Sequence, residues 1–315
     1  MKRILASLAA LLALTAVPRA QEFTVFAGAM RSPVSVAQSY SWQLEFRQPF
    51  ARHAAWSLSW LNEGHIYGHH RDGWAAQAWS RLLEGENFSF ALGLGAYRYF
   101  DTQHAAHGDS VNIHGWAPLV SLEATYRTAS PWFFRLRANR AAPRDEILVD
   151  TLTLGVGYRF GEQPLATPTA RGAAHEFTVY GGRTFANTRL SRRGLAASLE
   201  YRRDLARGLE WTLAWLDEGD PDVIRRHGVA TQVWLAGRYL EDRLALGFGF
   251  GAYAYVDRRR PGHTSHVDLA TLVSPSVAYR FSRSWMARFT WHRVSTDYAR
   301  DADVFLLGFG YRRER

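Results

Sequence analysis

A histidine, a serine and an aspartate near the C-terminal end of the chain could together perform hydrolytic chemistry. His292 and Ser295 lie in the stretch "WHRVS", and Asp303 follows in "DADVF". These residue types form the triads in which a base activates a nucleophilic hydroxyl. If His292 lies near the end of one strand and Asp303 opens the next, the three side chains could meet at the end of a hairpin. The surrounding elements decide whether this stretch is an active site or a structural hairpin.

The chain is a tandem duplication. The segment "EFTVFAGAM" from Glu22 returns as "EFTVYGGRT" from Glu176, and similar matches at nearly the same offset continue through the rest of the chain. Self-similarity of this kind indicates one structural unit used twice. We therefore predict four parts, namely a signal peptide over 1–20, a first unit over 21–160, a linker over 161–175 and a second unit over 176–315.

Composition and the N-terminal segment restrict the class of protein. "MKRILASLAALLALTAVPRA" has a charged start and a short apolar run, as secretory signal peptides have. The chain contains no cysteine, which excludes disulfides and thiolate chemistry. Its net charge of +9 comes almost entirely from arginine. An exported chain with dispersed arginines is not expected to bind nucleic acid, whereas guanidinium groups suit the phosphates of lipopolysaccharide.

Large apolar residues alternate with small or polar residues along eight segments of each unit. In "DTLTLGVGYRF", Leu152, Leu154 and Val156 share one face, opposite Gly155 and Gly157. Connections alternate between tight turns such as "LEGEN" and long polar loops such as "DTQHAAHGDSVNIHG". Both patterns are typical of outer-membrane barrels with an apolar exterior. In the first unit the predicted strands are 22–31, 40–48, 55–62, 73–82, 87–100, 115–127, 131–140 and 150–160.

The fold class follows from this pattern. We predict an all-β chain, an antiparallel transmembrane β-barrel protein of the Gram-negative outer membrane, made of two homologous eight-stranded units in tandem. One sixteen-stranded barrel with a water-filled channel is the alternative. The linker, the aromatic end of the first unit at Phe160, and the bulky lumen residues Trp79 and Trp234 favour two barrels.

Polar residues that both units retain on the inner face predict a network inside each lumen. Carboxylates inside a narrow barrel need arginine or amide partners, because an unpaired buried charge is costly. The predicted network comprises Glu45, Gln77 and Arg135 in the first unit, and Glu200, Gln232 and Arg288 in the second. Nearer the long loops, Glu63 and Asp101 correspond to Glu218 and Asp257.

The last hairpin resembles that of PagL-type lipid A 3-O-deacylases. These are eight-stranded outer-membrane barrels with a catalytic histidine and serine at the end of strand seven and a glutamate opening strand eight. The resemblance implies His292 as the base, Ser295 as the nucleophile and Asp303 as the orienting acid. The chain departs from the family in placing two residues between histidine and serine, where the family has one, and in using aspartate. The first unit has Asn139 and Ala142 at the histidine and serine positions.

Loop residues supply the remaining candidates. The stretches "DVIRRHG" and "DRRRPGH" carry adjacent arginines. We predict that these arginines contact lipopolysaccharide, namely Arg225, Arg226, Arg258, Arg259 and Arg260. Histidines cluster in "NEGHIYGHHRDG", without a spacing that defines a metal site, so we expect no metal and no other cofactor.

Together these patterns indicate a non-enzymatic outer-membrane protein. It would have a structural, interaction or small-solute role at the lipopolysaccharide-containing surface, with outer-membrane lipid and lipopolysaccharide as partners. The alternatives are a lipid A deacylase-like hydrolase that uses His292, Ser295 and Asp303, and a sixteen-stranded porin-like channel.

Overall fold

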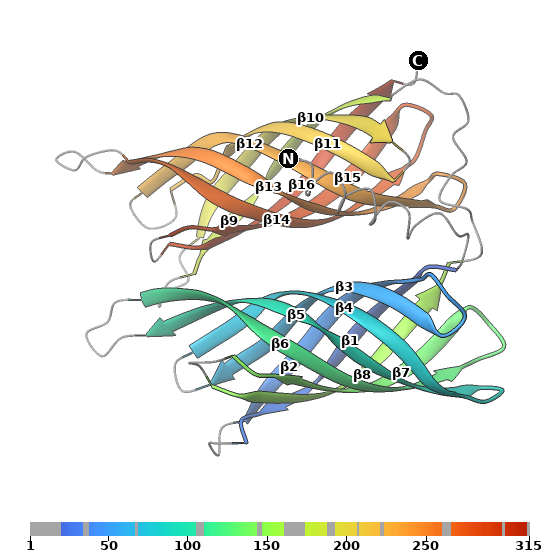
Figure 1. Ribbon diagram of the computed structural model, residues 1–315. Coiled ribbons are helices and arrows are strands. Elements are labelled where there is room, and N and C mark those ends of the chain that lie inside the picture. Colours follow the sequence, from blue (N-terminus) through green and yellow to red (C-terminus); the bar gives the residue numbers. More distant parts are fainter. Residues whose placement is uncertain are drawn as a thin grey trace, which may run out of the picture. The chain divides into compact units, whose positions relative to one another are not determined.

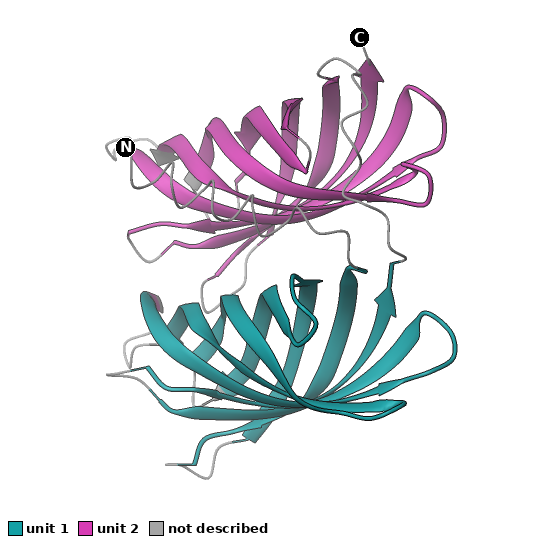
Figure 2. Ribbon diagram, turned by 45° about the vertical axis from the view of Figure 1, so that its right-hand side comes forward, with its two compact units in different colours: residues 1–104, 112–164 teal, residues 105–111, 165–315 magenta. Residues whose placement is uncertain are grey.

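Two closed barrels make up the chain in a computed structural model (Figure 1). They fall into two compact units (Figure 2). The structure describes residues 20–33, 38–66, 69–104, 110–143, 147–160, 174–187, 193–206, 208–220, 224–259, 266–297 and 300–313. Residues 1–19 of the predicted signal peptide and 161–173 of the predicted linker lie outside this part of the chain.

The first barrel contains eight antiparallel strands, each paired with its neighbours in sequence. It closes where β1 pairs with β8, with Glu22 opposite Arg159. The strands are β1 (Glu22–Arg31), β2 (Gln38–Pro49), β3 (Ala54–Ile66), β4 (His69–Glu84), β5 (Phe88–His104), β6 (Ser110–Arg127), β7 (Trp132–Ala141) and β8 (Val149–Arg159).

The second barrel repeats this arrangement and closes where β16 pairs with β9. The two closures confirm the predicted pair of eight-stranded barrels and show that the single sixteen-stranded barrel is wrong. The strands are β9 (His175–Ala186), β10 (Arg193–Ala206), β11 (Leu209–Asp217), β12 (Ile224–Tyr239), β13 (Leu244–Arg259), β14 (His266–Arg280), β15 (Trp285–Ser295) and β16 (Ala302–Arg313).

The outer surfaces of the barrels are apolar. On β8, Leu152 and Leu154 are 57% and 60% exposed, and on β16 Leu307 is 65% exposed. Between these residues, glycines face inward. A Cβ atom on Gly155 would contact the Phe26 ring at 2.5 Å, so only glycine fits beside that ring. The alternation therefore separates an apolar exterior from a crowded interior, as predicted.

Aromatic side chains gather near the short-turn end of each barrel. Trp132 lies edge-on to Tyr158, with ring centroids 5.1 Å apart, and Trp285 lies edge-on to Tyr311 at the same distance. The two pairs occupy equivalent positions in the duplication. Such rings form the interfacial girdle of transmembrane barrels. Within the described residues, the chain has no helix of the length and apolarity needed to cross a bilayer.

Candidate functional site

Paired charges fill the lumen of the first barrel. We call Arg47, Arg135, Arg137, Glu22, Glu45 and Glu123 the first lumen cluster; none of the six is more than 7% exposed. Arg137 donates two hydrogen bonds to Glu45, at 2.7 and 2.8 Å. Arg47 donates two to Glu123, at 2.7 and 2.9 Å. Three guanidinium groups thus balance three carboxylates, which is how a narrow lumen can hold charges at tolerable cost.

Aromatic rings cover these guanidinium groups. The Arg47 guanidinium lies 3.9 Å from the ring centroid of Trp79, and that of Arg137 lies 4.1 Å from the ring centroid of Phe26. Trp79 donates its Nε1–H to Ser57 Oγ at 2.8 Å. Cation–π contacts strengthen when both partners are shielded from water. Ion pairs and rings together block the middle of this lumen.

A layer of amide and hydroxyl groups adjoins the first lumen cluster. Gln77 donates to Ser121 Oγ at 2.8 Å, and Ser121 donates to Asn139 Oδ1 at 2.7 Å. Asn139 in turn donates to Thr151 Oγ1 at 3.0 Å. These contacts link four strands across the interior, so this layer ties the wall of the barrel together.

The second lumen contains a related set with partly different members. We call Arg202, Arg288, Arg312, Glu176, Glu200 and Glu210 the second lumen cluster. Arg202 donates to Glu200 at 3.1 Å and to Glu210 at 2.8 Å. Arg288 donates to Glu176 at 2.8 Å. Paired charges again occupy the interior.

All of the predicted lumen residues lie inside their barrels, each at most 5% exposed. They are Glu45, Gln77, Arg135, Glu200, Gln232 and Arg288. Several partners that complete their contacts were not predicted. Glu123 and Arg137 in the first barrel have no charged counterpart in the second, so a comparison of the two units does not single them out.

His292 lies in the lumen beside a serine that the sequence analysis did not single out. Its Nδ1 is 2.6 Å from Oγ of Ser274 on β14, and the side chain is 5% exposed. Ser274 also accepts a hydrogen bond from Gln232 at 2.9 Å. The histidine thereby takes part in the polar layer that Asn139 occupies in the first barrel. Ser295 is three positions away, which places it on the opposite face of a regular strand.

The Asp303 carboxylate has partners other than the predicted histidine. It accepts hydrogen bonds from Trp291 Nε1 at 2.8 Å and from Arg293 Nη1 at 2.9 Å. In the β15–β16 register, Asp303 lies opposite Arg293, and His292 lies opposite Val304. Because successive residues of a strand face opposite sides, this register turns Asp303 away from His292. The register therefore does not bring the predicted orienting acid to the face of the predicted base.

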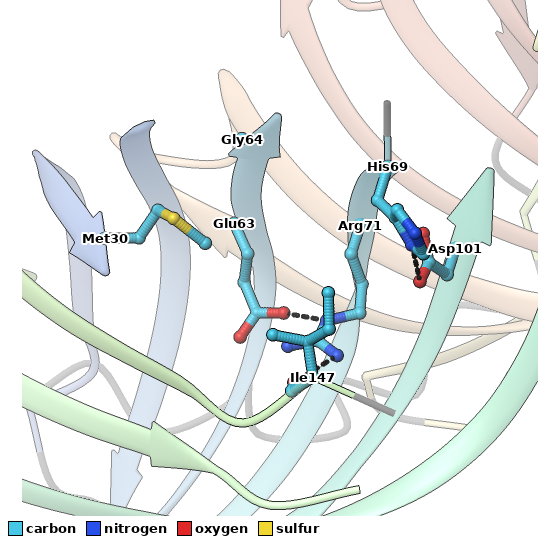
Figure 3. A pocket seen from close by; sticks show the side chains of 7 residues that line it. All are labelled: Met30, Glu63, Gly64, His69, Arg71, Asp101 and Ile147. Carbon is cyan, nitrogen blue, oxygen red and sulfur yellow. Dashed lines mark hydrogen bonds and ion pairs between the residues drawn. The ribbon is translucent and has the colours of Figure 1, made fainter. Parts of the chain in front are cut away.

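A second polar group lies at the loop-side end of the first barrel (Figure 3). We call Glu63, Arg71 and Asp101 the first mouth cluster; none is more than 5% exposed. Arg71 donates from Nε to Glu63 and from Nη1 to the backbone oxygen of Ile147 at 2.9 Å. Asp101 contacts Nδ1 of His69 at 3.1 Å. These contacts hold the connection between β7 and β8 against the mouth.

A small cavity of about 10 Å³ adjoins the first mouth cluster. Among the described residues, Glu63 Oε1, Arg71 Nη2 and Asp101 Oδ1 are buried without a hydrogen-bond partner. A cavity of this size with several polar partners can hold one water molecule.

The second barrel has the same arrangement, formed by Glu218, Arg226 and Asp257, the second mouth cluster. Arg226 Nε lies 3.0 Å from Glu218, and its Nη2 donates to the backbone oxygen of Arg300 at 3.1 Å. Arg300 corresponds to Ile147 in the duplication. The matching arginines Arg71 and Arg226 were not recognised as a pair in the sequence analysis, although the offset that aligned the neighbouring glutamates also aligns them.

The predicted lipopolysaccharide-contacting arginines divide into three groups. The Arg225 side chain is 62% exposed and lies 2.7 Å from Asp217. Arg226 is only 3% exposed, so its predicted surface contact is wrong: the strand turns it into the lumen. Arg258 and Arg259 lie in β13, but their side chains are outside the description, as is all of Arg260.

No protein-family model matches the chain, and no curated protein matches it. Solved structures do match. The N-terminal β-barrel domain of Pseudomonas aeruginosa OprF is 12% identical, with a TM-score of 0.37, over 45% of this chain and 100% of that domain.

Two further structures match over 45% of this chain. Neisserial surface protein A is 12% identical, with 97% of its chain covered and a TM-score of 0.38. The attachment invasion locus protein Ail of Yersinia pestis is 15% identical, with 99% covered and a TM-score of 0.35. At these identities the likeness concerns the fold alone. The resemblance to PagL-type deacylases stays a prediction from the sequence.

Proposed function

We propose that the chain is a non-enzymatic outer-membrane protein whose barrels each span the bilayer and present their loop-side ends to the lipopolysaccharide-containing surface. The observation that carries this proposal is the placement of apolar residues outside and charges inside. Leu154 and Leu307 are 60% and 65% exposed, whereas Glu45 and Arg137 are fully buried. An apolar exterior of this kind is unfavourable in water and favourable in lipid, where closed barrels satisfy every backbone group.

The filled lumens favour a structural or interaction role over transport. Each lumen is crossed by ion pairs and by a buried tryptophan, Trp79 in the first barrel and Trp234 in the second, which are 3% and 0% exposed. An eight-stranded barrel is just wide enough for side chains to fill it. The loop-side ends then remain as the surfaces for partners, and exposed Arg225 is suited to lipopolysaccharide phosphate.

Fractionation of cells that produce the full-length chain tests the membrane assignment. We expect the protein in the outer-membrane fraction, with faster gel migration before heating than after. Recovery from the soluble fraction would contradict the proposal. In planar bilayers we expect no stepwise conductance of porin size, and such steps would favour the small-solute role instead.

Mass spectrometry of lipid A from the same cells tests the absence of enzymatic activity. We expect identical spectra with the unmutated protein and with His292→Ala at equal membrane levels. Loss of an acyl chain only with the unmutated protein would overturn the non-enzymatic proposal and establish the deacylase alternative.

A further inference from the structure

A β-bulge near the tip of the β3–β4 hairpin changes which residues face each other. Asn62 lies opposite Asp72, but the next pair is His65 opposite His70, so two residues of β3 stand against one residue of β4. Gly64 forms the bulge with φ +68°, and its backbone N–H donates to Asn62 Oδ1 at 2.9 Å. Without the bulge, His65 would face His69. The bulge therefore creates a cross-strand histidine pair.

The two imidazole rings of this pair lie close together at the loop-side end of the first barrel. Their centroids are 4.4 Å apart, with the ring planes inclined by 38°. His65 is exposed and His70 is partly exposed. The carboxylate of Asp72 lies 3.7 Å from Nε2 of His70. The two imidazoles are thus adjacent, and the carboxylate lies beside one of them.

We infer that His65 and His70 bind one first-row transition-metal ion, with Cu²⁺ the tightest. Imidazole nitrogen is a preferred ligand of Cu²⁺, Ni²⁺ and Zn²⁺, and Cu²⁺ forms the most stable complexes of the series. In the described part of the chain, no three His, Cys, Asp or Glu side chains converge on one point. The site is therefore a two-imidazole site that closes by side-chain rotation, with solvent in the remaining positions.

The second barrel supplies an internal comparison. Gly219 has the same backbone conformation, with φ +69°, and its N–H donates to Asp217 Oδ1 at 2.8 Å. At the positions of His65 and His70 it carries Asp220 and Arg225, a pair of opposite charge. The corresponding positions thus carry two imidazoles in the first barrel and two opposite charges in the second.

Calorimetric titration of tag-free full-length protein in detergent with CuCl₂ tests the inference, alongside electron paramagnetic resonance of the Cu²⁺ complex. We expect saturation at one ion per chain and nitrogen hyperfine coupling from two imidazoles. Removal of even an outer-shell partner costs about 10- to 100-fold in metal affinity, so His65→Ala or His70→Ala should raise the Kd by at least about tenfold.

Two variants control the experiment. His69→Ala removes an adjacent histidine from the opposite face of the same strand and should leave the Kd unchanged. The double substitution Asp220→His with Arg225→His should give the second barrel a site and raise the stoichiometry to two. Absence of saturable binding, an equal loss in His69→Ala, or unchanged affinity in both His65→Ala and His70→Ala would overturn the inference, provided heat-dependent gel migration shows that the variants fold.

Discussion

The two lumens hold balanced charges with different residues. In the first barrel Glu123 and Arg137 lie directly opposite each other on β6 and β7, with side-chain atoms 2.5 Å apart. The second barrel has Ser276 and Thr290 in the same register. A carboxylate and a guanidinium have thus been exchanged together for two hydroxyl residues. The difference indicates that the ion pair, and not the single charged residue, is the unit of substitution inside a narrow barrel.

The second barrel has added a charged group nearer its short turns. Arg238 donates to Asp204 at 2.8 Å and to Glu210 at 3.1 Å. The first barrel has Leu83 and Ala55 at the positions of Arg238 and Glu210. Charged residues of opposite sign are therefore gained together as well as lost together, and the charges within each lumen stay balanced.

The largest effect is expected when only one partner of a buried ion pair is removed. Glu123→Ala leaves Arg137 without its closest partner and should cost about 3–5 kcal/mol of unfolding free energy. The double substitution Glu123→Ser with Arg137→Thr, which copies the second barrel, should cost much less, because Arg47 keeps Glu45 at 3.0 Å. Urea titration of the first barrel in lipid vesicles measures both. Equal losses in the single and double variants would show that charge balance is not the governing constraint.

A charge on the outer surface should affect the two barrels equally. Leu154→Arg and the equivalent Leu307→Arg should each lower the free energy of unfolding by roughly 2–4 kcal/mol if both lie near the bilayer midplane. Leu154→Val and Leu307→Val, measured in the same vesicles, serve as controls that keep the apolar surface. A large effect in one barrel alone would mean that only that barrel faces lipid at this level.

Gly64 and Gly219, which both have positive φ, should also behave alike. Gly64→Ala and Gly219→Ala place a side chain at positive φ and against a backbone oxygen, that of Tyr40 or Leu195 respectively. We expect each substitution to lower the free energy of unfolding by about 1–3 kcal/mol. Gly181→Ala, where no atom lies within 4 Å of the added Cβ, should change the same unfolding midpoint little. A small effect at Gly64 would show that the hairpin tolerates a different register.

The smallest effect is expected at the histidine that first suggested catalysis. His292→Asn restores the residue of the first barrel, where Asn139 contacts Ser121 as His292 contacts Ser274. We expect a change of no more than about 1 kcal/mol in unfolding free energy, the value of one hydrogen bond. A much larger loss would mean that the second barrel has adapted specifically to the imidazole ring.

Much of the fold was predictable because alternation and duplication are local signals that repeat. Leu152, Leu154 and Val156 mark the outer face without any knowledge of neighbouring strands. Strand ends were less predictable. β4 begins at His69, whereas the pattern placed its start at 73, because the hairpin continues beyond the apolar belt into residues without clear alternation.

The polar sites were predictable only where both units retained the same residue. Glu45 and Glu200 were found by that comparison, whereas Glu123 was not, since its counterpart is serine. The pairing of His65 with His70 depends on a bulge. A shift of one position in register reverses the face of every following side chain, and sequence spacing does not reveal it. The inward direction of Arg226, in contrast, follows from the regular alternation of β12, which places Arg226 on the same face as Gln232 and Trp234.

The even number of strands in each closed barrel has a consequence for how such a chain can grow. A barrel of eight strands begins and ends at the same rim. The connection to a duplicated copy can therefore start at the rim where the first copy also began. A unit with an odd number of strands would end at the opposite rim. The even number of strands alone allows this architecture to grow by repetition of the gene segment.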